Sequence, residues 1–200
     1  MSDPPLSTAE LLRRALGQRA AACLQRAGVT NLRDLGMAGV AELTASYGLE
    51  PKSAEKAAAV LELARAIHTE PLVRGAPFNG SSDVYRAFGP RLRDLKVEQF
   101  WVILIDGKHR VIREVLVSQG TLTSSPVHPR EVFSQAIRHA AAAICLVHQH
   151  PSGDPSPSAD DLEITRRFVQ VGDLVGIRVC DHVICGDSSY VSLADRGLLT

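Results

Sequence analysis

Short apolar runs separated by polar, turn-forming segments mark the second half of the chain. Two runs, 99–106 and 110–118, have the length and the β-branched and aromatic content of strands, and Asp106-Gly107-Lys108-His109 predicts a turn between them. The apolar run from Ala141 to Val147 predicts a buried strand. Helices are expected at 129–140 and 158–171, and two more strands near the C-terminal end. This order predicts an α/β fold with a curved mixed sheet flanked by helices.

The first part of the chain is rich in Ala, Leu and Arg and lacks strand-like alternation. It predicts helices from residue 7 onward, broken near Gly28, Gly36 and Gly48. The clearest runs from Ser53 to His68, where apolar residues recur three or four positions apart. We therefore expect a small all-helical domain at residues 1–70.

Helix-breaking residues follow this region. Pro71, Gly75 and Pro77 come first, and Asn79-Gly80-Ser81-Ser82 extends the irregular stretch. We place a linker at 71–81 and the α/β domain at 82–200, beginning with a short helix from Ser82 to Phe88.

Composition is compatible with this two-part organisation. At 200 residues and 45% hydrophobic content, the chain can bury the core of one medium domain with a small appendage. No apolar run reaches membrane-spanning length, and Met1-Ser2-Asp3-Pro4-Pro5 lacks the basic and apolar regions of a signal peptide. We expect a cytoplasmic protein with no membrane partner, while the sequence does not indicate an oligomeric state.

The cysteines do not suggest a disulfide scaffold, because the chain has only four and they are dispersed. The spacing of Cys180 and Cys185 admits a metal-binding interpretation, but both lie in an apolar strand-like run, which favours buried free thiols. His182, on the same strand, is either part of a site or a structural histidine.

Two histidines and a carboxylate follow the buried strand in a spacing that suits a metal. His148 and His150 share one face of the strand, with Ile144 and Leu146 behind them. A stiff loop rich in proline leads to Asp161, in the first turn of the next helix. Two imidazole nitrogens and one carboxylate suit zinc, and three protein ligands leave a fourth position for water. We therefore predict one catalytic Zn²⁺ per chain.

Local structure offers a second explanation for part of this pattern. Ser158-x-x-Asp161 is also the pattern of a helix capping box, with aspartate in place of glutamate. A His-x-His pair on an apolar strand is by itself more often a core or surface feature. Asp154 is either part of the loop's shape or an outer partner of a histidine.

The complete motif resembles that of a known family. The stretch HQHPSGDPSPSADDLEIT, with H-x-H, seven residues, S, two residues and D, is similar to the JAMM motif of MPN domains in the RadC family. The resemblance extends over about 84–200 and includes FWVILID at 100–106, VHPREVF at 127–133 and DHVI at 181–184. It implies an MPN metalloprotease-like fold with a zinc-dependent peptidase or isopeptidase activity.

The resemblance also implies two catalytic roles. Ser158 would hydrogen-bond the oxyanion, and an upstream glutamate at the head of an early strand would be the general base. Glu98 is our candidate, because it immediately precedes a predicted strand. Glu131 is the main rival, although its place in the first turn of a predicted helix has a local explanation in the helix dipole. Glu114 is a third possibility.

A DNA partner is expected to bind weakly at most. Relatives in the RadC family usually begin with a helix-hairpin-helix segment containing Gly-x-Gly, whereas this chain has Gly48-Leu49-Glu50. Residues 1–75 hold nine Lys or Arg against eight Asp or Glu, without the basic excess typical of DNA binding. A local cluster of Arg91, Arg93 and Lys96 is interpreted as a solvated face.

These observations favour hydrolysis of a peptide or isopeptide bond in a protein or peptide substrate. Two alternatives remain at this stage. The chain could be a DNA-associated repair or recombination accessory protein with a structural or vestigial metal site. It could also be a metal-dependent hydrolase of nucleic acid, although a two-metal nuclease would need more clustered carboxylates than Asp160 and Asp161.

Overall fold

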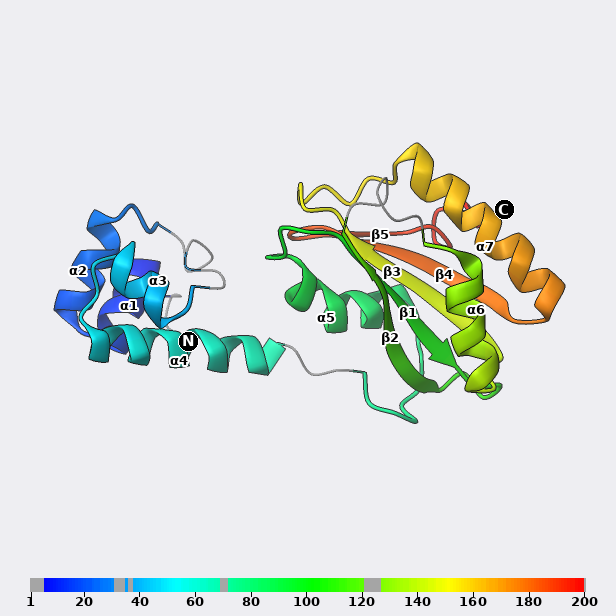
Figure 1. Ribbon diagram of the computed structural model, residues 1–200, viewed down its shortest axis with the longest axis horizontal. Helices are drawn as coiled ribbons and strands as arrows, with labels where there is room; N and C mark the ends of the chain where they lie inside the picture. The colour runs from blue at the N-terminus through cyan, green and yellow to red at the C-terminus, as the bar shows by residue number, and fades with distance from the viewer. Residues whose placement is uncertain (1–5, 31–34, 36–37, 69–71, 121–126, 200) are drawn as a thin grey trace, which may run out of the picture. The chain divides into compact units, whose positions relative to one another are not determined.

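The structure is a computed structural model that describes residues 6–30, 35, 38–68, 72–120 and 127–199. The chain divides into two compact units, residues 1–67 and 68–200, which are described separately (Figure 1). Among the described helices, none combines the length and apolar character needed to cross a bilayer.

The first unit consists of helices packed on one another. They are α1 (Thr8–Leu16), α2 (Gln18–Arg26), α3 (Val40–Ala45) and α4 (Pro51–His68). Their core is built mainly from leucine and alanine, and Leu24, Leu43 and Ala54 are completely buried. The predicted helical character of this part of the chain is therefore confirmed.

Glycines separate these helices, though not only where the sequence indicated. Gly28 and Gly48 have φ angles of 84° and 67°, which other residues rarely adopt. A further break at Gly17, with φ of 87°, divides α1 from α2 and was not predicted. Gly36 lies outside the described residues. The last helix begins at Pro51 rather than Ser53, because proline is well suited to a first helical turn.

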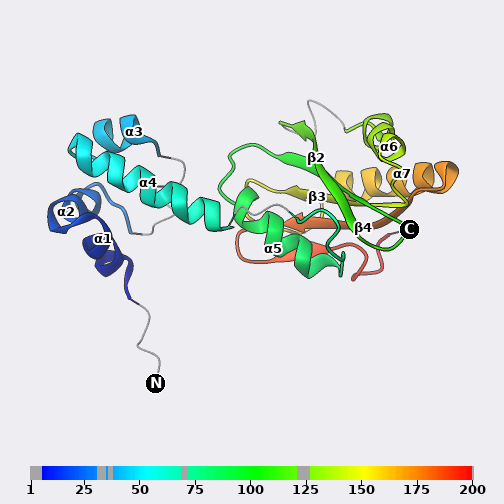
Figure 2. The same ribbon diagram turned by 90° about the horizontal axis from the view of Figure 1, so that it is seen from below.

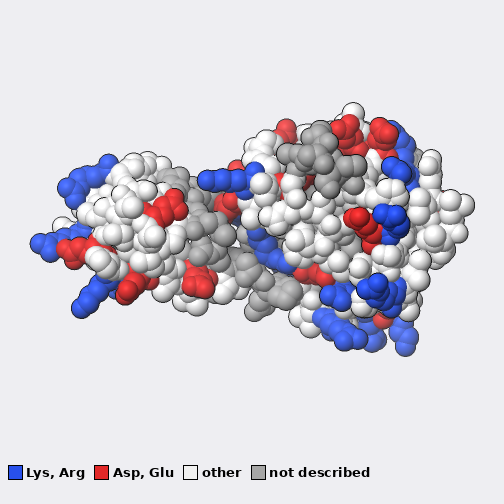
Figure 3. All heavy atoms as spheres, in the orientation of Figure 1, with Lys and Arg blue, Asp and Glu red and all other residues white. Residues whose placement is uncertain are grey.

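Charges on the first unit are balanced. Glu50, at the position where the resemblance leads us to expect glycine, lies 3.8 Å from Arg19 as an exposed ion pair. Figure 3 shows acidic and basic side chains interspersed over the visible face of this unit. The described surface in that view therefore resembles a general solvated surface more than a phosphate-binding track.

The second unit is built on one mixed sheet, as predicted. Its strands are β1 (Gln99–Ile105), β2 (Val111–Gln119), β3 (Ala143–Gln149), β4 (Arg178–Cys185) and β5 (Tyr190–Ser192). They lie in the order β2-β1-β3-β4-β5, in which β3 and β4 are parallel and the other neighbours are antiparallel. Irregular register between β1 and β2 is typical of a bent sheet.

Helices cover both faces of this sheet (Figure 2). On one face, α5 (Ser81–Leu92) contributes Val84 and Phe88 to a core with Ile103 and Val147. On the other, α6 (Pro129–Arg138) and α7 (Ala159–Val175) pack over the strands, with Phe133 and Phe168 in the core. The central strand β3 is thus buried on both sides, which explains its continuous apolar run.

Two sequence expectations near α5 are corrected by tertiary contacts. The helix continues past Gly89 and Pro90, because Leu92 extends the buried face begun by Val84 and Phe88. Arg91, which was expected to lie on a solvated face together with Arg93 and Lys96, is instead largely buried. Arg91 lies over the rings of Phe88 and Trp101 and forms a 2.7 Å ion pair with Glu114, in which the side chains are only 15% and 8% exposed.

The stretch expected to be a linker pairs with the second unit where it is described. The Gly75 and Phe78 backbone amides donate to the carbonyls of Val111 and His109, both at 2.8 Å. The Leu72 amide donates to Glu114 Oε1 at 2.7 Å. Residues 69–71 lie outside the described residues. The described part of the predicted linker, 72–81, is therefore an ordered border of the second unit.

Candidate metal centre

His148 and His150 meet at the C-terminal end of β3. His148 is completely buried and pairs with Phe100 on β1 and Ile184 on β4. His150 follows directly after the strand, with a side chain that is 18% exposed. Their Nε2 atoms lie 3.1 Å apart, so both rings point at one place. A strand with alternate residues on one face produces this convergence.

A rigid loop returns the chain to these histidines. Gly153, with φ of 80°, accepts a hydrogen bond from the Asp187 amide in the β4–β5 turn, at 3.0 Å. A Cβ atom at Gly153 would lie 2.8 Å from the Asp187 side chain, so this close approach, like the positive φ, favours glycine. The loop is thus held against the sheet before α7 begins.

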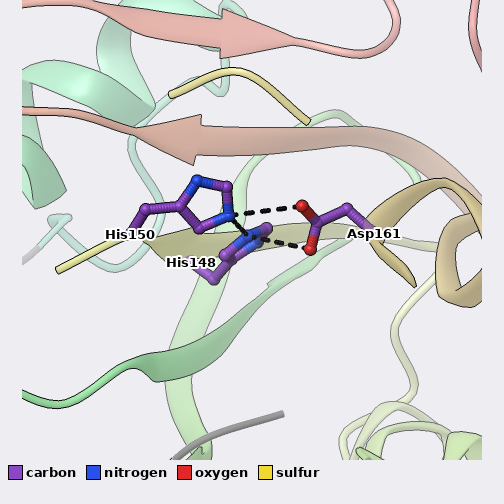
Figure 4. A group of neighbouring side chains, drawn as sticks. All are labelled: His148, His150 and Asp161. Atoms are coloured by element: carbon purple, nitrogen blue, oxygen red, sulfur yellow. Dashed lines mark hydrogen bonds and ion pairs between the residues drawn. The ribbon is translucent and has the colours of Figure 1, made fainter. Parts of the chain in front are cut away.

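Asp161 enters the site from the first turn of α7 (Figure 4). Its carboxylate is completely buried, with Oδ1 3.2 Å from His148 Nε2 and Oδ2 3.2 Å from His150 Nε2. Within the described part of the chain, these three residues form the one group able to bind a metal through ligand atoms within 4.8 Å of one another.

Ser158 caps the same helix. Its Oγ accepts from the Asp161 amide at 3.1 Å and donates to Asp161 Oδ2 at 2.7 Å, while its own amide donates to the same oxygen at 2.7 Å. The capping box anticipated from sequence is present, and it also orients the carboxylate. In this arrangement the hydroxyl proton of Ser158 is directed at Asp161.

Hydrogen bonds at the far nitrogens orient both imidazoles. His150 Nδ1 lies 2.8 Å from the Asp154 carbonyl, which can only accept, so Nδ1 carries a proton and Nε2 has a lone pair whenever the ring is neutral. Asp154 thus contacts the histidine through its backbone. His148 Nδ1 lies 2.8 Å from His182 Nε2, which places His182 directly behind the histidine pair.

Glu98 is the carboxylate that the fold brings beside the histidines. It immediately precedes β1, and its Oε1 lies 3.9 Å from His148 Nε2. Burial raises the pKa of Glu98, an effect that the neighbouring histidines partly oppose. Gln149 holds this segment in place, because its side-chain amide accepts from the Gln99 amide and donates to the Val97 carbonyl.

The rival glutamates have other local environments. Glu131 is exposed in the first turn of α6, where its carbonyl accepts from Ser134 Oγ at 2.9 Å. Glu114 is engaged by Arg91 and by the Leu72 amide. Among Glu98, Glu131 and Glu114, it is therefore Glu98 that lies within ion-pair distance of a histidine of the pair.

The cysteines offer no comparable site. All four thiols are free, and Cys180 Sγ donates to the Ile144 carbonyl at 3.1 Å. Burial raises the pKa of Cys185 to about 12. A metal ligand must be a thiolate, so the buried, protonated thiol of Cys185 is structural.

The electrostatics of the centre favour a cation. Burial alone would raise the pKa of Asp161, but hydrogen bonds with His148 and His150 hold it well below its usual range. Buried atoms Asp161 Oδ1 and Glu98 Oε1 have no hydrogen-bond partner. When the two imidazoles are neutral, their Nε2 lone pairs face these oxygens, and a bound cation would satisfy all of them together. Nitrogen and carboxylate ligands in this arrangement fit a divalent metal such as zinc.

Two contributors to this geometry were missed from sequence. Thr165, buried on α7, contacts His182, and Gln149 positions the segment that carries Glu98. In the sequence, Gln149 is only a polar residue between two histidines, and Thr165 is only a threonine one helical turn after Asp161. Their contacts with the site could be recognised only once the strands and α7 were placed together.

The chain is similar to proteins of one family. The family model of the RadC-like JAB domain matches residues 78–198. A UPF0758 protein of Syntrophotalea carbinolica is 51% identical over 168 residues, covering 84% of this chain and 74% of that protein. One from Geobacter sulfurreducens is 47% identical, with 89% and 77% covered. One from Methanosarcina acetivorans is 42% identical, with 84% and 74% covered. The chain therefore belongs to the family defined by the RadC-like JAB domain.

Proposed function

We propose that this protein is a zinc-dependent metallopeptidase or isopeptidase that acts on a protein or peptide substrate. One observation carries the proposal: the Nε2 atoms of His148 and His150 converge with the buried oxygens Asp161 Oδ1 and Glu98 Oε1, and neither oxygen has a hydrogen-bond partner. Family membership supports it, because JAB domains are often metallohydrolases.

In this proposal His148, His150 and Asp161 hold one zinc ion per chain. When bound, zinc lowers the pKa of a coordinated water to about 7 and polarises a carbonyl group. The two histidines contribute neutral nitrogens, and Asp161 contributes the negative charge. The Ser158 hydroxyl and amide keep that carboxylate aligned with the rings.

Glu98 is the proposed general base. It lies beside the ligand set with a free buried oxygen, so it can accept a proton from the attacking water and pass it to the departing amine. Its raised pKa suits this role, because a carboxylate whose pKa lies closer to the working pH accepts a proton more readily. Ser158 would stabilise the oxyanion only after its hydroxyl turns away from Asp161.

The test compares two glutamate-to-glutamine variants of the full chain. Zinc-loaded wild type is assayed against libraries of linear and isopeptide-linked peptides, with chelator and zinc re-addition as the first control. Glu98→Gln should retain zinc and fold but lose about 10²-fold or more in rate. Glu131→Gln is the matched control and should retain wild-type activity, because Glu131 is exposed on α6.

The outcomes separate the base assignment from the activity itself. An active Glu98→Gln with an inactive Glu131→Gln would move the base to Glu131. Equal activity in wild type, Glu98→Gln and Asp161→Asn would remove the enzymatic proposal altogether.

A further inference from the structure

A buried chain of hydrogen bonds runs from α7 through β4 to the metal centre on β3. Thr165 Oγ1 lies 2.5 Å from the Asp161 carbonyl and 2.6 Å from His182 Nδ1. His182 Nε2 lies 2.8 Å from His148 Nδ1. Thr165, His182 and His148 are each completely buried, so water does not compete for these contacts.

The chemistry of these groups sets the direction of every bond. The Asp161 carbonyl can only accept, so the single hydroxyl proton of Thr165 is donated to it. Thr165 Oγ1 must then accept from His182 Nδ1. Because a buried neutral imidazole carries one proton, His182 Nε2 has only a lone pair and accepts from His148 Nδ1. The proton of His148 is thereby placed on Nδ1, and its Nε2 is left free.

Packing holds the rings in this arrangement. The Phe100 ring stacks on His148 with centroids 5.9 Å apart and meets His182 edge-on at 5.6 Å. The His182 amide donates to Asp181 Oδ1 at 2.7 Å, and Asp181 also accepts from Ser192 Oγ at 2.7 Å. Neither ring can turn over without losing both its packing and its hydrogen bonds.

We propose that Thr165 and His182 are positioning residues that select the metal-binding tautomer of His148. The inference rests on the proposed metal centre and assigns a purpose to two residues outside the ligand set. In the opposite tautomer, a proton on His148 Nε2 would occupy the direction of Asp161 and the ion. Partners of this kind typically contribute 10- to 100-fold to metal affinity.

Zinc affinity tests the proposal through two matched substitutions. Thr165→Val preserves the shape of the side chain but removes the hydroxyl, whereas Thr165→Ser preserves the hydroxyl. We expect competition titration with a chelator to show about 10- to 100-fold weaker zinc binding in Thr165→Val. Affinity in Thr165→Ser should lie within about threefold of wild type. Equal affinity in all three proteins would overturn the proposal.

Tautomers are measured directly in the metal-free protein, so this arm does not depend on zinc. Long-range ¹⁵N–¹H spectra should show Nδ1-protonated rings for both His148 and His182 in wild type. In Thr165→Val, His148 should shift toward the Nε2-protonated form. A His148 ring protonated on Nε2 alone in wild type refutes the relay whether or not zinc binds. Failure of wild type to bind zinc, with the expected tautomers present, would instead refute the proposed function.

Discussion

Replacing Ser158 with alanine separates the structural role of this residue from a catalytic one. The substitution removes the acceptor of the Asp161 amide and the hydroxyl donor to Asp161 Oδ2, at 3.1 and 2.7 Å. Loss of a serine N-cap costs about 1 kcal/mol, and loss of a hydrogen bond to a charged group costs about 1.5 kcal/mol. The Ser158 amide still donates to Oδ2 at 2.7 Å, which limits the damage. We expect a destabilisation of about 2 kcal/mol in total.

Urea unfolding of the metal-free protein measures this change. Ser134→Ala is the control, since the exposed Ser134 hydroxyl only donates to the Glu131 carbonyl in its own helix and should contribute less than about 0.5 kcal/mol. A Ser158→Ala variant as stable as this control would refute the capping argument. In the zinc-loaded enzyme, retained hydrolysis indicates capping alone, whereas a loss of about 10²–10³-fold indicates an oxyanion role.

Three further predictions concern pH, a buried ion pair and DNA. Hydrogen bonding to Asp161 raises the pKa of His150 above 6.5, so its contribution to metal-free stability is complete below that pH and is lost as pH rises through the raised value. As pH rises, the melting temperature of the metal-free protein should fall, whereas the extra stabilisation that zinc provides should grow, because the metal competes with the proton for His150. A rise in the metal-free melting temperature together with weaker stabilisation by zinc would contradict this. Glu114→Gln should destabilise the protein by about 3 kcal/mol in urea unfolding, because Arg91 is left largely buried without its partner; a change below about 1 kcal/mol would contradict this. Duplex DNA binding, measured by fluorescence anisotropy, should be weak and fade between about 50 and 200 mM salt, and tight binding at the higher salt would establish residues 1–70 as a DNA module.

The sequence predicted the structure best where residue spacing along a single strand or helix decides which side chains point together. The apolar run of β3, its alternating faces and the proline-rich loop predicted that His148 and His150 point together and that Asp161 lies in the first turn of a helix. Glu98 was selected by its place before a strand, and strand pairing brings it to His148. The placement of the histidines and of Asp161 follows from period and spacing, which a single sequence displays, whereas the search for an upstream glutamate came from the resemblance to the RadC family.

Expectations failed where long-range packing outweighed local composition. The helix expected at 82–88 continues through Gly89 and Pro90, because Leu92 extends its buried face. Arg91 looked solvent-exposed until β2 placed Glu114 beside it. Thr165 could not be identified because its role depends on His182, a contact that exists only after α7 packs on β4.

Metal content provides the most direct test of the central claim, that His148, His150 and Asp161 form a zinc site. Purified wild-type protein analysed by plasma mass spectrometry should contain close to one zinc per chain. The His148→Ala/His150→Ala double variant, purified in the same way, should contain almost none, because the one remaining ligand cannot retain zinc. Full zinc occupancy in that double variant would place the metal elsewhere in the chain and contradict the account.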